Sequence, residues 1–190
     1  MIAQLADMMV SSQLKNRRIS EADKAIYRYG YILMMETMVN ILISVLIGVL
    51  FHVLAEVIWF LMIFVPLRSY AGGYHMNRAW KCIIATNVMI AGITLTAVYI
   101  IHTVPVFPWL VAEALSCAAI CVLAPVDTKA KPLDDGEKKV YRRKTWLICA
   151  VEALIHTVVL LLGMERLTYV GIMAHAALVV SLTLEKWNKG

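Results

Sequence analysis

The chain has 190 residues, of which 61% are apolar and only 16% are charged. Because a typical globular domain has about 25% charged residues, this composition excludes a soluble single-core protein and favours an integral membrane protein. The net charge of +5 does not indicate nucleic-acid binding, because the basic residues are confined to short segments between apolar runs. Such segments are typical of contacts with anionic lipid head groups and of membrane topology signals.

Residues 1–28 precede the main apolar runs and are expected to form a cytoplasmic segment at the membrane interface. Within residues 1–14, Ile2, Leu5 and Met9 fall on one helical face, with polar residues between them. This pattern predicts an amphipathic helix that lies in the interface rather than crossing the bilayer. The alternative is a frayed terminus, since chain ends are often unordered.

Six apolar runs follow, and most of them reach about the 17–25 residues that a helix needs to cross a bilayer. They cover residues 31–51, 53–67, 82–103, 106–123, 145–163 and 168–184. The runs lack the alternation of a transmembrane β-strand. The sequence therefore predicts an all-α, polytopic membrane protein with about six transmembrane helices, forming a single domain over residues 1–190.

The distribution of basic residues predicts the orientation of these helices. Of the 18 Lys and Arg residues, all except Arg166 fall before the first run, in alternate loops, or after the last run. Positively charged loops stay in the cytoplasm. Both termini and the segment 68–81 are therefore expected to face the cytoplasm.

The second apolar run is short for a membrane span. Its 15 residues, 53–67, would rise only about 22 Å as a helix, against a hydrocarbon core of roughly 30 Å. The segment 68–81 is therefore expected to dip into the membrane. Irregular backbone at that depth is tolerated only beside protein or a water-filled cavity, which indicates a chamber at this place.

His75 and Cys82 lie seven residues apart in and after that segment. A cysteine nucleophile needs at least a thiol and a nearby imidazole that can take the proton of the thiol. Cys82 is expected at the start of a helix, whose partial positive charge favours the thiolate, as do the basic neighbours Arg78 and Lys81. On one continuous helix the two residues would be about 10.5 Å apart, so the backbone must bend between them.

The remaining histidines and cysteines are given structural roles. Histidines 52, 102, 156 and 175 are expected to be hydrogen-bonded polar residues at the membrane surface. Cysteines 117, 121 and 149 are expected to be small core residues. Because a metal site needs three or four ligands and these residues lie on different spans without ligand spacing, neither a metal nor another cofactor is predicted.

Four polar residues inside the predicted spans are candidates to orient His75 or to line the chamber. Glu36 and Asn40 stand four residues apart and share a helical face, and Glu113 and Glu152 lie in the fourth and fifth runs. Intramembrane carboxyl groups are costly and are usually buried with a partner. Hydrogen bonding between helices is the alternative role for each, and no third catalytic residue is assigned.

Two blocks of sequence resemble a known family. The stretch Arg68-Ser-Tyr-Ala-Gly72-Gly73-Tyr-His75, followed by Cys82, is similar to the signature of the accessory gene regulator protein B (AgrB) family. The block Ala124-Pro-Val-Asp-Thr-Lys-Ala-Lys-Pro132, followed by Glu137 and Arg142-Arg143, resembles the loop after that family's fourth span. Chain length and number of spans agree as well, so the resemblance covers nearly the whole chain.

The resemblance implies a membrane cysteine endopeptidase of a Gram-positive bacterium. His75 would be the base and Cys82 the nucleophile, with Arg68, Gly72 and Gly73 supporting the site. The enzyme would cut the C-terminal tail from a precursor peptide of the accessory gene regulator protein D type through an acyl-enzyme. A thiol or hydroxyl of the peptide would then close a cyclic thiolactone or lactone signal for quorum sensing. Partners implied are this peptide, membrane lipids and a second copy of the chain in a homodimer.

Residues 125–144 form the predicted basic cytoplasmic loop. Lys129, Lys131, Arg142 and Arg143 are candidates to attract an acidic peptide tail through a long-range field; the alternative is that they only enforce topology. The rival function is a non-enzymatic peptide exporter or transporter, in which His75 and Cys82 are incidental. A transporter more often shows related halves with broken helices near the midplane, and the sequence shows no such symmetry.

Overall fold

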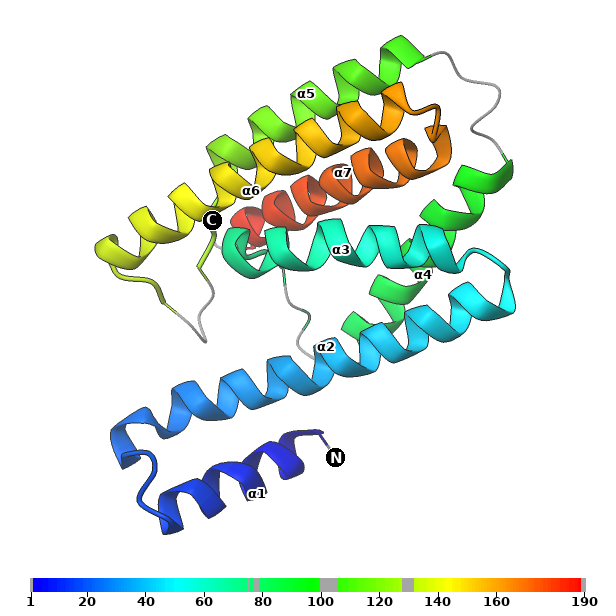
Figure 1. Ribbon diagram of the computed structural model, residues 1–190. Helices are drawn as coiled ribbons and strands as arrows, with labels where there is room; N and C mark the ends of the chain where they lie inside the picture. Colours follow the sequence, from blue (N-terminus) through cyan, green and yellow to red (C-terminus); the bar gives the residue numbers. More distant parts are fainter. Residues whose placement is uncertain (1, 75, 77–78, 100–105, 128–131, 189–190) are drawn as a thin grey trace.

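The computed structural model describes residues 2–74, 76, 79–99, 106–127 and 132–188 (Figure 1). These residues form helices joined by short connections, and the predicted all-α fold is confirmed. In chain order the elements are α1 (Ile2–Lys15), the 3₁₀ helix η1 (Glu21–Asp23), α2 (Lys24–Leu50), α3 (Leu54–Ala71), α4 (Ala79–Tyr99), α5 (Val106–Leu123), α6 (Asp135–Leu161) and α7 (Glu165–Trp187).

Five of the described helices are long and apolar enough to cross a membrane, namely α2, α3, α4, α6 and α7. The apolar stretch of α5 is shorter, at residues Phe107–Leu123. Many large apolar side chains on these helices are exposed in the isolated chain, among them Leu42 on α2 and Leu154 on α6. Exposed apolar surface of this extent is typical of a protein whose surroundings are lipid.

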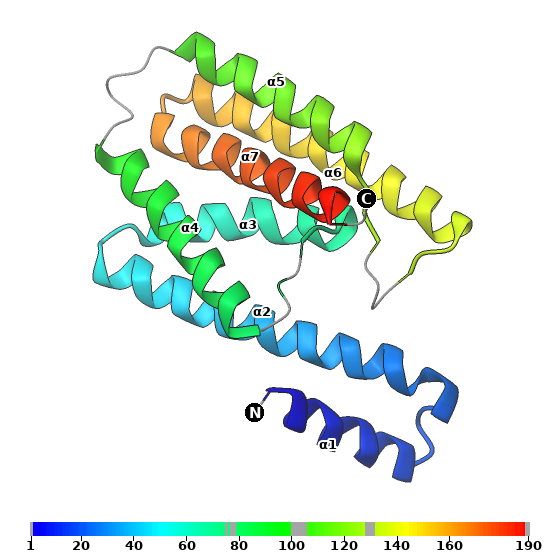
Figure 2. The ribbon, with the colours of Figure 1, turned by 180° about the vertical axis from the view of Figure 1, so that it is seen from behind.

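Helix α7 is the centre of the bundle. It contacts α3, α4, α5 and α6, and its middle is the most completely buried of the candidate spans. Figures 1 and 2 show α5, α6 and α7 side by side, with α3 along the other side of α7. Val57 and Phe60 of α3, Ile90 of α4 and Ala174 of α7 meet in the apolar core at this place.

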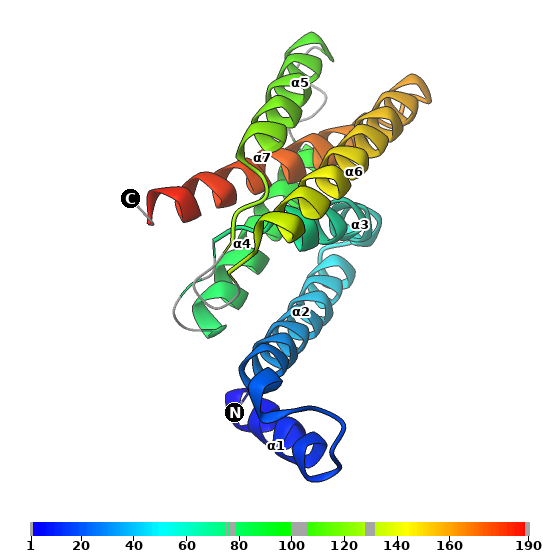
Figure 3. The ribbon, with the colours of Figure 1, turned by 90° about the vertical axis from the view of Figure 1, so that its left-hand side faces the viewer.

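Helices α1 and α2 form an arm at one side of the bundle (Figure 3). The predicted N-terminal helix is present, and it packs antiparallel to α2. Arg28 Nε donates a hydrogen bond to Asp7 Oδ1 at 2.6 Å, and this pairing holds the pKa of Asp7 below its ordinary value. Gln13 also donates to the hydroxyl of Tyr31. The position of α1 in the membrane interface stays a prediction.

Helices α2, α3, α4, α6 and α7 all extend beyond the apolar runs that predicted them, and the extensions of α3 and α6 lie beside the motif segment and the basic loop. Helix α3 continues through Pro66 and Arg68 to Ala71, so its 18 residues rise about 27 Å. Helix α6 begins at Asp135, inside the predicted basic loop, with a capping box in which Asp134 and Glu137 bond each other's backbone N–H groups at 2.7 and 3.3 Å. Charged residues border both apolar runs in the sequence, but both helices continue through these charged residues.

Candidate active site

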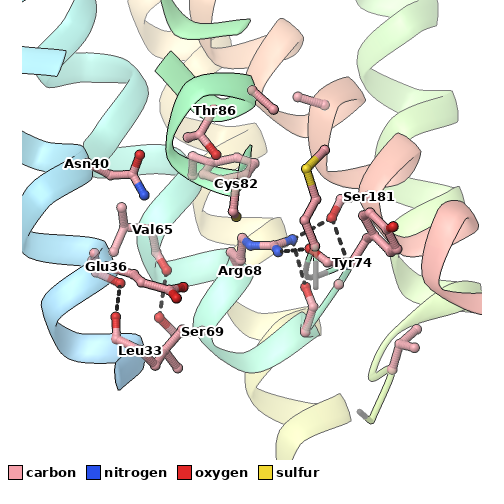
Figure 4. Close-up of a pocket in the computed structure, with 18 of the residues that line it drawn as sticks. Leu33, Glu36, Asn40, Val65, Arg68, Ser69, Tyr74, Cys82, Thr86 and Ser181 are labelled. Atoms are coloured by element: carbon pink, nitrogen blue, oxygen red, sulfur yellow. Dashed lines mark hydrogen bonds between the residues drawn. The ribbon is translucent and has the colours of Figure 1, made fainter. Parts of the chain in front are cut away.

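A cavity of about 370 Å³ lies between α2, α3, α4, α7 and the segment that follows α3 (Figure 4). It brings together six of the site residues that the sequence singled out. They are Arg68, Gly72, Gly73 and Cys82 from the motif, and Glu36 and Asn40 from α2. The chamber expected beside this segment is therefore present among the described residues.

Cys82 lies in the first turn of α4, which begins at Ala79. Its thiol is free and half-buried, and in Figure 4 the side chain projects toward Arg68. A helix start places backbone N–H groups and a partial positive charge near the sulfur. The predicted position of Cys82 at a helix N-terminus is thus confirmed.

Arg68 organises the backbone next to the cavity. From the last turn of α3, its Nη2 donates to the carbonyl of Tyr74 at 2.6 Å and its Nη1 donates to Ser181 Oγ at 2.5 Å and, more weakly, to the carbonyl of Gly72 at 3.5 Å. The same Ser181 of α7 accepts from the N–H of Tyr74, at 3.0 Å to Oγ and 3.1 Å to its carbonyl oxygen. Arg68 therefore ties the end of α3, residue 74 and α7 together.

Gly72 and Gly73 make this close approach feasible. Their φ angles are +79° and +136°, which side-chain-bearing residues rarely adopt. A Cβ on Gly72 would lie 2.1 Å from the carbonyl oxygen of Val126, and one on Gly73 would lie 2.2 Å from Arg68 Nη1. Val126 also donates its N–H to the carbonyl of Ala71 at 2.9 Å. Gly72 thus allows the motif to contact the segment after α5, and Gly73 leaves room for the Arg68 side chain.

His75 and the basic residues Lys129 and Lys131 lie outside the described residues. The separation of His75 from Cys82 is therefore not among the described geometry. Arg142 and Arg143 lie in α6 and are exposed, and neither is among the described residues that line the cavity, whereas their neighbour Tyr141 is.

Glu36 and Asn40 line the cavity from α2, but they differ in their bonding. Asn40 accepts a hydrogen bond from Asn87 Nδ2 of α4 at 2.9 Å, and Asn87 Oδ1 accepts from Ser44 at 2.9 Å. Asn40 therefore joins two helices, which was the alternative role. Glu36 is half-buried at the cavity wall (Figure 4).

Ser181 is a site residue that the sequence analysis missed. It is one small polar residue within an otherwise apolar stretch of α7, and nothing near it in sequence marks it as special. The one available signal was general, since hydroxyl side chains in membrane helices often bond across to another helix. Its partners Arg68 and Tyr74 are more than 100 residues away.

A second polar cluster lies among α5, α6 and α7, and it corrects the prediction for two histidines. His156 and His175 were expected at the membrane surface, but they are 2% and 1% exposed. Glu113 and Glu152 neither line the described cavity nor contact the motif in the described bonds; they hydrogen-bond these two histidines. No metal site was expected from the sequence, because these residues lie on different spans. In the bundle those spans pack side by side, so the potential ligands come together.

Fold and site together define a polytopic helical membrane protein with a free thiol at a helix start, facing a cavity that a half-buried arginine and two glycines line. The family model of Accessory gene regulator B (AgrB) matches residues 3–184. The chain belongs to this family, and the resemblance noted in the sequence is confirmed. No curated protein and no solved structure matches the chain. Family membership ties it to the processing of the accessory gene regulator's autoinducing peptide.

Proposed function

We propose that the protein is a cysteine endopeptidase that removes the C-terminal tail of a short precursor peptide, with Cys82 as nucleophile and His75 as base. The observation that carries the proposal is the half-buried free thiol of Cys82 on the cavity of about 370 Å³ that Arg68, Gly72 and Gly73 also line. A cavity is where a peptide segment can be held against a nucleophile with little competing water.

The proposed reaction has two steps. His75 takes the proton of the Cys82 thiol, and the thiolate attacks the carbonyl carbon of the scissile peptide bond. The C–N bond breaks, His75 returns the proton to the leaving amine of the tail, and a thioester joins the remaining peptide to Cys82. A thiol or hydroxyl of the same peptide then attacks the thioester, which releases Cys82 and closes the ring of the autoinducing peptide.

Arg68 is proposed as a positioning residue for this chemistry. Its described bonds go to Gly72, Tyr74 and Ser181, and Tyr74 directly precedes His75 in sequence. Fixing the carbonyl and the N–H of residue 74 restricts where the base can be. Gly72 and Gly73 support the site because they allow the chain to pass this close to Arg68 and Val126.

The substrate proposed for the cavity has an apolar part and an acidic part. Leu61, Phe64, Ile90 and Leu184 give the lining an apolar side, which suits an amphipathic segment of the precursor. Lys129, Lys131, Arg142 and Arg143 are proposed to attract an acidic tail from outside the cavity. The cavity and both termini are proposed to face the cytoplasm, where a newly made peptide is found, in a bacterial cell membrane and with a homodimer as the assembled form.

The test is cleavage of the precursor encoded beside the gene, co-expressed with each variant and followed by mass spectrometry. Cys82→Ala and His75→Ala should release no tail while both variants still accumulate in the membrane. Cys121→Ala is the matched control, because it removes a thiol from α5 that does not line the described cavity, and it should cleave normally. Tail release by Cys82→Ala would refute the assignment, and export of uncut precursor would favour the rival transporter function.

A further inference from the structure

The second polar cluster has the composition and spacing of a transition-metal site. Glu113 and Cys117 stand four residues apart on α5, Glu152 and His156 four apart on α6, and His175 lies on α7. Residues four apart share a helix face, so each helix presents its ligands to one point. Figures 1 and 2 show these three helices side by side. The ligand atoms of Glu113, His156 and His175 lie within 4.8 Å of one another.

Four of the six ligand-to-ligand separations in the structure agree with a tetrahedral site. Glu113 Oε1 lies 2.9 Å from His156 Nδ1 and 3.1 Å from His175 Nδ1, and zinc bonds of 2.0–2.1 Å to N and O put such ligands about 3.3 Å apart. Cys117 Sγ lies 3.7 Å from Glu113 Oε1 and 3.8 Å from His175 Nδ1, and a zinc–sulfur bond of about 2.3 Å makes that edge about 3.6 Å. Along these four edges, shifts of a few tenths of an ångström would bring the ligand atoms to the separations of a zinc site.

Glu152 supplies an outer contact to one of the two histidines, His175. His175 Nε2 lies 3.0 Å from Glu152 Oε2, on the opposite side of the ring from Nδ1, which faces Glu113 and Cys117. Metal-binding histidines commonly donate their other N–H to a carboxylate, which fixes the tautomer and orients the ring. Glu152 is thus placed to hold His175 with Nδ1 unprotonated and directed at the ion.

One further feature favours a bound cation over a closed hydrogen-bond network, and a second shows how the His156 ring is accommodated. The second oxygen of Glu113, Oε2, is buried without a hydrogen-bond partner among the described residues, although a buried carboxylate oxygen normally has one. Gly171 leaves room for the His156 ring, since a Cβ there would lie 2.1 Å from Nε2. The ring therefore fits against α7 only because position 171 has no side chain.

We propose that Glu113, Cys117, His156 and His175 bind one Zn²⁺-class divalent cation that ties α5, α6 and α7 together. Mixed N, S and O ligands in a tetrahedron suit zinc, whereas magnesium and calcium prefer oxygen ligands alone. Binding requires the thiolate of Cys117 and unprotonated Nδ1 atoms on both histidines, so the protons they hold are released to solvent. Four protein ligands leave no open position, so the role is structural and separate from the chemistry at Cys82.

The experiment uses the full chain, purified in detergent with an affinity tag that contains no histidine, and measures zinc by elemental mass spectrometry. One zinc per chain is expected, with loss of thermal stability when a strong chelator removes it. Cobalt(II) should replace zinc and give the intense visible bands of tetrahedral coordination together with a thiolate charge-transfer band. Glu152→Gln should weaken metal affinity by about 10–100-fold, the usual effect of losing an outer-shell partner.

The controls separate metal binding from folding. Cys117→Ser should abolish the thiolate band of the cobalt form with little change in side-chain volume, whereas the matched variant Cys121→Ser, one turn along α5, should keep it. Cys82→Ala should retain the metal, which makes the result independent of peptidase activity. The proposed site would be overturned if the wild-type protein held no more zinc than the double variant His156→Gln,His175→Gln. A cobalt spectrum that Cys117→Ser leaves unchanged would overturn it as well.

Discussion

Replacing Gly72 by alanine should destabilise the site far more than an ordinary glycine substitution. The new Cβ would lie 2.1 Å from the carbonyl oxygen of Val126, a backbone atom that cannot rotate away, and the φ of +79° is itself unfavourable for alanine. A strained backbone conformation costs about 1–3 kcal/mol, and overpacking costs about 1–3 kcal/mol more. The expected loss is therefore about 2–6 kcal/mol, a large part of the total stability of about 5–15 kcal/mol of a typical protein.

Gly92→Ala is the matched control for this prediction. Gly92 lies in α4, and apart from the backbone of its own helix no atom of the described residues lies within 4 Å of a Cβ built there. Alanine in a helix interior is favoured over glycine by roughly 0.5–1 kcal/mol. Thermal unfolding of both variants in one detergent, together with tail release in cells, provides the assay. Gly72→Ala should unfold at lower temperature and lose cleavage, while Gly92→Ala should match or exceed the wild type. Equal stability of the two variants would refute the close approach between Gly72 and Val126.

Other consequences of the site geometry can be checked separately. Arg68→Lys should reduce tail release at least tenfold without loss of membrane insertion, because an ammonium group cannot reproduce the forked bonds to Tyr74 and Ser181; cleavage at the wild-type rate would contradict this role. Ser181→Ala should give a smaller loss, measured by the same assay, since the carbonyl at that position still accepts from Tyr74. In native protein, Cys82 should react with a thiol alkylator faster than Cys149, which is 2% exposed, as followed by peptide mass mapping; equal labelling would count against an activated thiol. A topology reporter fused after Lys139 should give a cytoplasmic signal, and an external signal there would refute the proposed orientation.

The helical membrane fold was predictable because the length and apolar content of a membrane span follow from the thickness of the bilayer. The C-terminal end of α3 and the N-terminal start of α6 were not predictable in this way. The apolar run of α3 ends before Arg68, and the apolar run of α6 begins only after the charged residues that follow Asp135. Arg68 continues α3 because its charge is bonded to Tyr74 and Ser181. That bonding depends on how α7 packs, which residue spacing does not reveal.

The motif around Cys82 was predictable for a different reason. Gly72, Gly73 and Cys82 are close in sequence, so their joint presence at one cavity follows from a single break between helices. The cluster on α5, α6 and α7 combines residues up to 62 positions apart, from Glu113 to His175. A signal was present all the same, since the pairs Glu113/Cys117 and Glu152/His156 each have the four-residue spacing of one helix face. Only the packing of the three helices shows that these faces meet.

The central claim, that Cys82 forms a thioester with the precursor, is tested most directly by intact-mass analysis of the enzyme after brief incubation with precursor and quenching in acid. The prediction is a species heavier than the enzyme by the mass of the precursor without its tail, attached at Cys82 and released by hydroxylamine, and absent from Cys82→Ala. A precursor whose ring-closing residue is replaced by alanine should increase the amount of this species, because the thioester then has only water to resolve it. Two results would contradict the account. One is tail release from the blocked precursor by the wild type without any such species, and the other is an adduct on a residue other than Cys82.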